Sequence, residues 1–182
     1  MRHAISGIHR VAENQHGYLS AAQAAEAGVS DAALAAMTRR GTVERLSRGV
    51  YRIAQYPADR LGQYMEAVLW PQRGVRGVLS HESALEFHEL SDANPARLHI
   101  TIPPEHRVRR AVPRHLELHF SALAPDDVLI LDGVPVTTPA RTIADCAHAH
   151  LSPLLIRQAI DDGRRHGKLT HRDADELLTL LG

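Results

Sequence analysis

Residues 17–54 read GYLSAAQAAEAGVSDAALAAMTRRGTVERLSRGVYRIA, and this stretch decides the fold of the first part of the chain. Ser20 precedes an alanine-rich run and has Gln23 three residues later, which is the pattern of a capping box at a helix N-terminus. Gly28 suits the left-handed residue that ends a helix, and Ser30 can cap the helix that follows. The stretch therefore predicts two short helices joined by a tight turn: residues 21–27 and 31–40.

A β-hairpin follows the second of these helices. Residues 42–46 and 50–54 carry the apolar residues of two strands, and the turn between them contains Gly49, which can adopt a positive φ. Upstream, apolar residues recur at helical spacing over residues 2–14. The order helix, helix, turn, helix, hairpin is that of a winged helix-turn-helix, and we assign residues 1–56 to such a domain.

This domain type predicts a set of DNA contacts. The second helix of the motif enters the major groove, while the hairpin grips the backbone or a minor groove. The candidate DNA-binding residues lie on that helix, at its end and on the hairpin: Ser30, Asp31, Ala35, Thr38, Arg39, Arg40, Arg45, Arg48 and Arg52. Because the helix is rich in alanine, specificity would depend on the wing and on DNA shape. A winged helix that only contacts other proteins is the alternative.

Charge is distributed unevenly along the chain. The 182 residues include 21 basic and 21 acidic residues, yet up to Arg60 there are eight arginines against five acids. The basic front and the acidic remainder therefore suit different partners. The single cysteine, Cys146, fits a reducing cytoplasm, and no apolar run approaches the roughly 20 residues that span a bilayer. We expect a cytoplasmic protein with no membrane partner.

The sequence after Pro57 predicts a separate domain, residues 57–182, of mixed α/β structure ending in helices. Together with the winged helix it makes an α+β protein. The expected helices cover residues 61–70 and 80–90 and begin again after Thr138, Ser152 and Thr170. The expected strands cover residues 97–102, 115–120, 128–131 and 134–137, the last two joined at Asp132-Gly133.

The sequence gives less support to a metal site or an enzyme active site. Thirteen histidines are present, but no HExxH pair, and neither a Walker A loop nor a GxGxxG or GxSxG motif occurs. A nuclease-like carboxylate cluster is the alternative to solvated turn acids for four residues: Asp126, Asp127, Asp132 and Asp145. We favour turn acids, and expect no enzyme activity, no metal and no cofactor.

Three motifs occur in order along the chain: RGVY at residues 48–51, LSHESAL at 79–85 and VTTPARTIAD at 136–145. Together they resemble the AbiEi family of antitoxins, from abortive-infection (AbiE-type, type IV) toxin–antitoxin systems. The resemblance implies that the first domain binds inverted repeats in operator DNA upstream of its own operon and represses it. It also implies that the second domain opposes a nucleotidyltransferase-like toxin, by direct binding or by an indirect route.

Four residues of the shared motifs are candidates for toxin neutralisation: Ser80, His81, Arg141 and Asp145. Arg141 falls in the first turn of a predicted helix, where its charge opposes the helix dipole, so a partner such as Asp145 at i+4 is expected. That pair is either an internal salt bridge or part of a toxin contact. We also expect Ser80 and Thr138 to cap their helices. The alternative function is a stand-alone winged-helix regulator whose second domain senses a ligand or dimerises.

Overall fold

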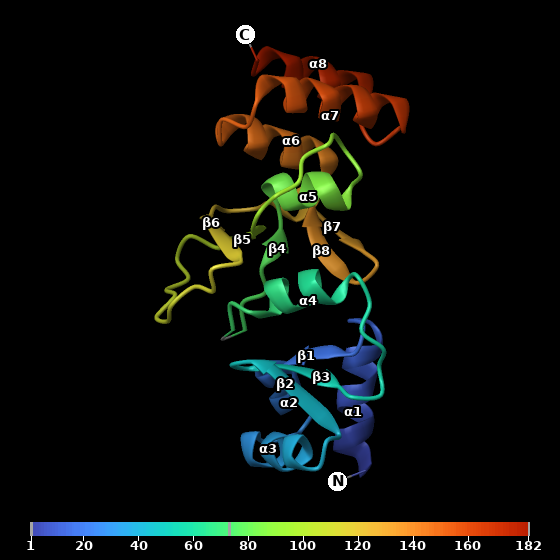
Figure 1. The fold of residues 1–182 in the computed structure, drawn as a ribbon, viewed down its shortest axis with the longest axis vertical. Coiled ribbons are helices and arrows are strands. Elements are labelled where there is room, and N and C mark those ends of the chain that lie inside the picture. The colour runs from blue at the N-terminus through green and yellow to red at the C-terminus, as the bar shows by residue number, and fades with distance from the viewer. Residues whose placement is uncertain (1, 73, 182) are drawn as a thin grey trace. The chain divides into compact units, whose positions relative to one another are not determined.

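The computed structural model describes residues 2–72 and 74–181 (Figure 1). The chain forms two compact units: Met1–Gly77 with Ile130–Val134, and Val78–Leu129 with Pro135–Gly182. The first unit thus takes in a segment beyond residue 56 and the tip of a hairpin far along the chain. The domain boundary that we place after residue 56 from the sequence stays a prediction.

The first unit has the predicted order of a winged helix-turn-helix. Its elements are α1 (Arg2–Glu13), β1 (Tyr18–Ser20), α2 (Ala21–Glu26), α3 (Asp31–Arg39), β2 (Val43–Ser47), β3 (Val50–Ile53) and α4 (Gly62–Leu69). The three strands form an antiparallel sheet in the order β1-β3-β2. The sequence does not predict β1, because three residues between a helix and a cap are too few to show alternation.

The helix boundaries follow the predicted capping chemistry. The Gln23 backbone N–H donates to Ser20 Oγ at 3.1 Å, and the Ser20 N–H donates to Gln23 Oε1 at 2.9 Å, which completes a capping box. Gly28 has a φ of +81° after α2, and Ser30 Oγ accepts from the Ala33 N–H at 3.3 Å at the start of α3. Local sequence therefore determines the turn from which α3 departs.

Apolar side chains of the helices and the small sheet form the core of the first unit. Its buried members are Ile8, Ala12, Leu19, Ala24, Val29, Leu34, Met37, Val43 and Ile53. Leu34 and Met37 supply the buried side of α3, so Asp31, Ala35 and Arg39 lie exposed on the helix. This packing decides which side of α3 remains available to a partner.

A mixed five-stranded sheet, in the order β6-β5-β4-β8-β7, carries the second unit. The strands are β4 (Val78–Leu79), β5 (Leu98–Ile102), β6 (Leu116–Phe120), β7 (Val128–Leu131) and β8 (Val134–Thr137). β5 runs parallel to β6 and antiparallel to β4, and β4 runs parallel to β8. Asp132 and Gly133 have φ values of +47° and +78°, as the predicted Asp-Gly hairpin turn requires.

Helices complete the second unit and confirm the α+β class. They are α5 (His81–Phe87), α6 (Pro139–His148), α7 (Pro153–Arg165) and α8 (His171–Thr179), with a short 3-10 helix, η1, over Pro125–Asp127. In Figure 1, α6, α7 and α8 lie in succession beyond α5. Leu85, Ile143 and Ile156 are among the buried side chains that join these helices. Within the described ranges, no helix is both long and apolar enough to cross a membrane.

Candidate DNA-binding surface and polar cluster

The predicted DNA-binding residues of α3 differ in how free their side chains are. Asp31, Ala35 and Arg39 are exposed, and Arg40 is exposed just after the helix ends. Thr38 is half-buried, and its hydroxyl donates to the Leu34 carbonyl at 2.9 Å, so this group is already used by the helix backbone. The charged candidates on α3 are therefore the most accessible to a ligand.

The β2–β3 hairpin forms the wing and presents Arg45 and Arg48, both exposed. The strand register shifts between Arg45 and Ser47, which marks a bulge just before the turn. Gly49 has a φ of +81°, and a Cβ placed there would lie 1.8 Å from Gln72 Oε1. The turn that carries Arg48 therefore favours glycine for its conformation, and the flexible Gln72 side chain packs against it.

Arg52, the remaining candidate on the wing, is held by a neighbouring strand. Its Nη2 donates to Glu44 Oε2 at 2.7 Å, and only 16% of its side chain is exposed. Glu44 and Arg52 are register partners across β2 and β3, so the ion pair stabilises the pairing of these strands. A phosphate contact by Arg52 would have to compete with Glu44.

Three of the DNA-binding candidates are exposed arginines with no acidic partner in the part of the chain that the structure describes. Arg39, Arg40 and Arg45 take part in no ion pair within residues 2–72 and 74–181. A guanidinium that no carboxylate neutralises can bind a phosphate group at little cost, because no internal contact has to break. The end of α3 and the wing together thus form a basic surface suited to a nucleic-acid backbone.

In the second unit, the predicted pair between Arg141 and Asp145 forms within α6. Arg141 Nε donates to Asp145 Oδ1 at 2.8 Å, Nη1 to Asp127 Oδ2 at 2.7 Å, and Nη2 to Ser121 Oγ at 3.2 Å. The Arg141 side chain is only 21% exposed. Reading Asp127 and Asp145 as solvated turn acids is wrong, because both carboxylates hold this one guanidinium.

Ser80 and His81 lie where β4 leads into α5. Ser80 is buried, and its hydroxyl accepts from Thr101 Oγ1 at 2.8 Å and lies 3.0 Å from His81 Nδ1. The expectation that the Ser80 side chain caps α5 is wrong, because this hydroxyl makes no cap hydrogen bond. Thr138 does cap α6, by accepting from the Arg141 N–H at 3.4 Å.

Three imidazole rings, those of His81, His99 and His119, gather beside Ser80 and form the histidine cluster. The rings of His81 and His119 stack with their centroids 3.5 Å apart, and His99 Nδ1 lies 3.0 Å from His119 Nε2. Burial, reinforced by the neighbouring histidines and Arg141, lowers the pKa of His81 to about 3. Burial also lowers the pKa of His99 and of His119, so the cluster is neutral at pH 7.

The histidine cluster does not make a metal centre. Its rings lie face to face, so their nitrogens do not converge on one point. In the part of the chain that the structure describes, no three histidine, cysteine or acidic side chains are placed to hold a metal ion.

The four candidates of the second unit, Ser80, His81, Arg141 and Asp145, lie in one region. The positive charge of Arg141 helps to lower the pKa of His81, and the negative charge of Asp145 partly opposes the lowering of the pKa of His119. Sequence reasoning missed the two strand histidines of the cluster, although both fall on predicted strands. Side chains alternate between the two faces of a strand, so the sequence places His99 and Thr101 on one side of β5. His119 is the register partner of Thr101 on β6.

Comparison with known proteins identifies both parts of the chain. Residues 8–54 match the family described as "Transcriptional regulator, AbiEi antitoxin", and residues 75–154 match the "AbiEi antitoxin C-terminal domain". The crystal structure of the RV2827C protein from Mycobacterium tuberculosis has a similar fold, with a TM-score of 0.54 and 14% sequence identity. The match covers 97% of this chain and 71% of that one. The comparison with curated proteins gives no match.

The two family matches agree with the structure. The first falls on the winged helix, from α1 to β3, and the second runs from the segment before β4 into the start of α7. Together they span more than half of the chain and occur in the order of the three motifs found in the sequence. Both families consist of antitoxins, and the first is described as a transcriptional regulator. The chain belongs to the AbiEi family of antitoxins.

Proposed function

We propose that this chain is the antitoxin of an abortive-infection pair of type IV, which represses its own operon and opposes a nucleotidyltransferase-like toxin. The winged helix would bind inverted repeats in the operator, and the second unit would meet the toxin. The observation that carries the proposal is the group of exposed arginines at the end of α3 and on the wing of an AbiEi chain, of which Arg39, Arg40 and Arg45 form no ion pair among the described residues. We further propose that the chain is not an enzyme and acts in the cytoplasm.

The composition of α3 determines how the operator would be read. Between Asp31 and Arg39 the helix has four alanines, which offer no hydrogen bond to a base edge. Phosphate contacts from the arginines would position the protein, while Arg48 at the tip of the wing would enter a minor groove or hold the backbone. Sequence preference would then come largely from groove width and DNA deformability. Two copies on inverted repeats would supply the affinity that one copy lacks.

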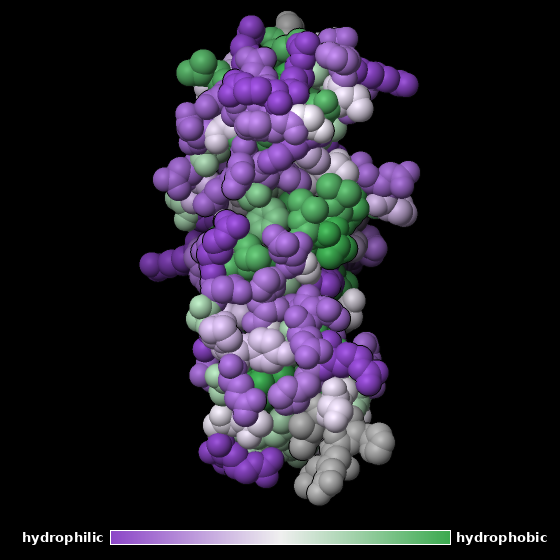
Figure 2. All heavy atoms as spheres, turned by 90° about the vertical axis from the view of Figure 1, so that its right-hand side faces the viewer, coloured by the Kyte–Doolittle hydropathy of each residue, from purple (hydrophilic) through white to green (hydrophobic). Residues whose placement is uncertain are grey.

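The surface proposed for the toxin is the β7 edge, residues Val128–Leu131. Leu129, Ile130 and Leu131 are exposed by 38%, 62% and 36%. Figure 2 shows apolar side chains gathered into a patch on an otherwise largely hydrophilic face. Because β7 is the last strand of its sheet, its outer backbone groups are open to a strand from another protein.

Charge around the β7 edge favours a basic partner over a second copy of this chain. Asp126 and Asp127 precede β7, and Asp132 follows it. Arg141 neutralises Asp127, but if two copies paired antiparallel about the middle of β7, Asp126 of one copy would lie one register position from Asp132 of the other, and these like charges would repel. A toxin that handles RNA is expected to be basic around its substrate site. We therefore assign the β7 edge to an apolar toxin strand with basic flanks.

The experiment measures operator binding and toxin neutralisation in the same variants. Arg39→Ala with Arg48→Ala is expected to weaken binding to DNA upstream of the operon roughly thirtyfold, from two phosphate contacts of about 1 kcal/mol each. The same variant should still rescue growth when the toxin is expressed. Leu129→Lys should do the reverse, because a lysine on an edge strand blocks strand addition.

A matched control removes the same charge elsewhere. Arg107→Ala with Arg109→Ala changes two exposed arginines of the second unit and should leave both properties as in the wild type. If the folded Arg39 and Arg48 variant also loses rescue, one surface serves both functions and the proposed division is wrong. Full rescue by Leu129→Lys would show that the toxin does not bind at the β7 edge.

A second candidate function, a stand-alone regulator that senses a ligand, is favoured by one observation. The first unit contains a hollow large enough for a small molecule, with a charged side chain in its wall. A gene for a nucleotidyltransferase-like protein beside this one would favour the antitoxin, and its absence would favour the regulator.

A further inference from the structure

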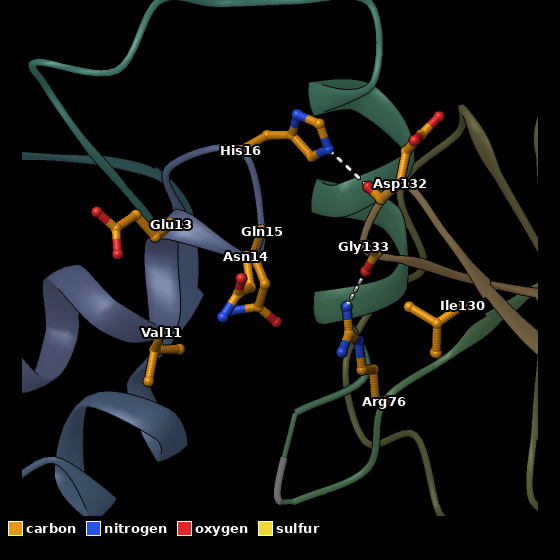
Figure 3. A pocket seen from close by; sticks show the side chains of 9 residues that line it. All are labelled: Val11, Glu13, Asn14, Gln15, His16, Arg76, Ile130, Asp132 and Gly133. Atoms are coloured by element: carbon orange, nitrogen blue, oxygen red, sulfur yellow. Dashed lines mark hydrogen bonds between the residues drawn. The ribbon is translucent and has the colours of Figure 1, made fainter.

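The hollow in the first unit has a volume of about 680 Å³, within the range of about 300–1,000 Å³ that is usual for small-molecule sites. Three segments contribute to it: the end of α1, the stretch before β4 and the turn between β7 and β8 (Figure 3). All of its lining residues belong to the first unit. Val11 and Ile130 give it apolar walls, and Arg76 supplies a charge.

Arg76 lacks an anionic partner. Its Nη2 donates to the Gly133 carbonyl at 2.9 Å and lies 3.5 Å from Met65 Sδ, while its Nε is buried without a hydrogen-bond partner. Across residues 2–72 and 74–181, no carboxylate forms an ion pair with it. Burial lowers the pKa of Arg76, which reflects the free-energy cost of a guanidinium without a counter-charge. An anion from outside the chain would offset that cost.

Two acidic residues, Glu13 and Asp132, also line the hollow, but among the described residues neither forms an ion pair with Arg76. His16 Nδ1 lies 2.7 Å from Asp59 Oδ2, and His16 Nε2 lies 2.7 Å from the Asp132 carbonyl. Burial opposes protonation of His16, but these two contacts raise its pKa above the usual value. In Figure 3 the carboxylate of Glu13 points away from Arg76.

The turn that completes the hollow is held in place by close packing. A Cβ on Gly133 would lie 2.3 Å from the Asn14 carbonyl oxygen, so only glycine allows the turn to approach α1 this closely. The same turn provides the carbonyls that bind Arg76 and His16. Arg76 is therefore held in place before any ligand arrives, which lowers the cost of binding.

We propose that this hollow binds a small molecule through a carboxylate or phosphate group, with Arg76 as the anchor and the positive charge of a protonated His16 nearby as electrostatic support. A guanidinium matches both oxyanions in charge and in the geometry of its N–H groups. Val11 and Ile130 would contact the apolar part of the ligand. This activity goes beyond the proposed antitoxin function, and its test uses neither DNA nor toxin.

The test is titration calorimetry of the full chain at fixed ionic strength with two anionic probes, inorganic phosphate and succinate, and with neutral succinamide. We expect saturable binding of at least one anion and none of succinamide, and the better probe identifies the oxyanion. Arg76→Gln should weaken that binding roughly tenfold or more, as expected for a lost charge-assisted hydrogen bond. Arg60→Gln, an exposed arginine of the same unit outside the hollow, should bind like the wild type.

Thermal melting shows that the variants are folded. Because Arg76 has no counter-charge, Arg76→Gln without ligand should melt at or above the wild-type temperature, and added anion should raise the melting temperature of the wild type and of Arg60→Gln by more than that of Arg76→Gln. Arg76→Lys keeps the positive charge and should bind with intermediate affinity, which also provides a test if Arg76→Gln fails to fold. No binding of either anion by the wild type, or equal binding by the wild type and the Arg76 variants, would overturn the proposal.

Discussion

The exposed arginines of α3 and the wing differ from Arg141 of α6 in what surrounds their guanidinium groups. Arg39 and Arg45 are exposed and form no ion pair within the described residues, whereas Arg141 is 21% exposed and binds both Asp127 and Asp145. The arginines at the end of α3 and on the wing leave positive charge available to a ligand, whereas Arg141 uses its charge to join η1 to α6. The number of arginines in a segment therefore says less about nucleic-acid binding than their internal partners do.

The largest effect is expected from Arg141→Ala. Removal of the guanidinium leaves Asp127 and Asp145 without their partner, and Asp145 Oδ2 already lacks one while buried. Because the group is partly accessible to water, we expect the free energy of unfolding to fall by about 2 kcal/mol, less than for a fully buried pair. Urea denaturation followed by circular dichroism measures this change.

A matched variant, Arg172→Ala, breaks another i,i+4 pair of the second unit. Arg172 and Glu176 are 86% and 63% exposed, so their separation should leave the unfolding midpoint unchanged. Equal effects of the two substitutions would mean that Arg141 is not a structural residue, and the contrast between the units would fail.

The next largest effect is expected in the pH dependence of the free energy of unfolding. The pKa of His81 is about 3 in the folded chain and near the ordinary value of 6.5 when unfolded, so the unfolded chain takes up the proton first. The contribution of His81 to stability is therefore complete above pH 6.5 and falls as the pH drops towards 3, by at most about 1.4 kcal/mol per pH unit. His81→Asn, which tolerates the φ of +52°, should flatten the dependence measured by urea unfolding between pH 5 and 7.5.

His16 of the first unit should change the stability with pH in the direction opposite to that of His81. Its pKa is raised in the folded chain, so its contribution is present below pH 6.5 and is lost as the pH rises through the folded value. His16→Asn should therefore remove stability at low pH rather than at high pH. If both variants changed the pH dependence in the same direction, the two units would not differ as the structure indicates.

The smallest effect is expected at a single wing residue. Arg45→Ala should weaken operator binding by about 1 kcal/mol and reduce the slope of log affinity against log salt by about one, as for one phosphate contact. Fluorescence anisotropy at several salt concentrations measures both quantities. Arg97→Ala in the second unit, where Arg97 binds Glu117 at 2.7 Å, should change neither. An unchanged salt slope for Arg45→Ala would place that arginine outside the DNA contact.

Features that depend on neighbouring residues in sequence could be predicted, and features that depend on distant ones could not. The capping box of Ser20 and Gln23 and the Asp132-Gly133 turn follow from local chemistry, and both are present. The two-residue strand β4 has no such pattern and is defined only by its partners, β5 and β8.

The same distinction applies to the candidate site. The pair of Arg141 with Asp145 follows from helical spacing, but its second partner, Asp127, comes from another element. Ser80 occupies a position in the sequence that is typical of a helix cap, yet its hydroxyl instead accepts a hydrogen bond from Thr101, which lies 21 residues away. On the wing, sequence shows Arg52 as one more basic residue, and only the strand register shows that Glu44 holds it.

The turn at Asp132-Gly133 also affects how the protein is made. Because Ile130–Val134 belongs to the first compact unit, that unit is not complete when its first 77 residues have left the ribosome. At a synthesis rate of about 5–20 residues per second, seconds pass before the Gly133 carbonyl can reach Arg76. During that interval a nascent chain exposes the winged helix without the segment that closes the unit. Translation of the second sheet therefore sets the time at which the first unit of a newly made antitoxin can finish folding.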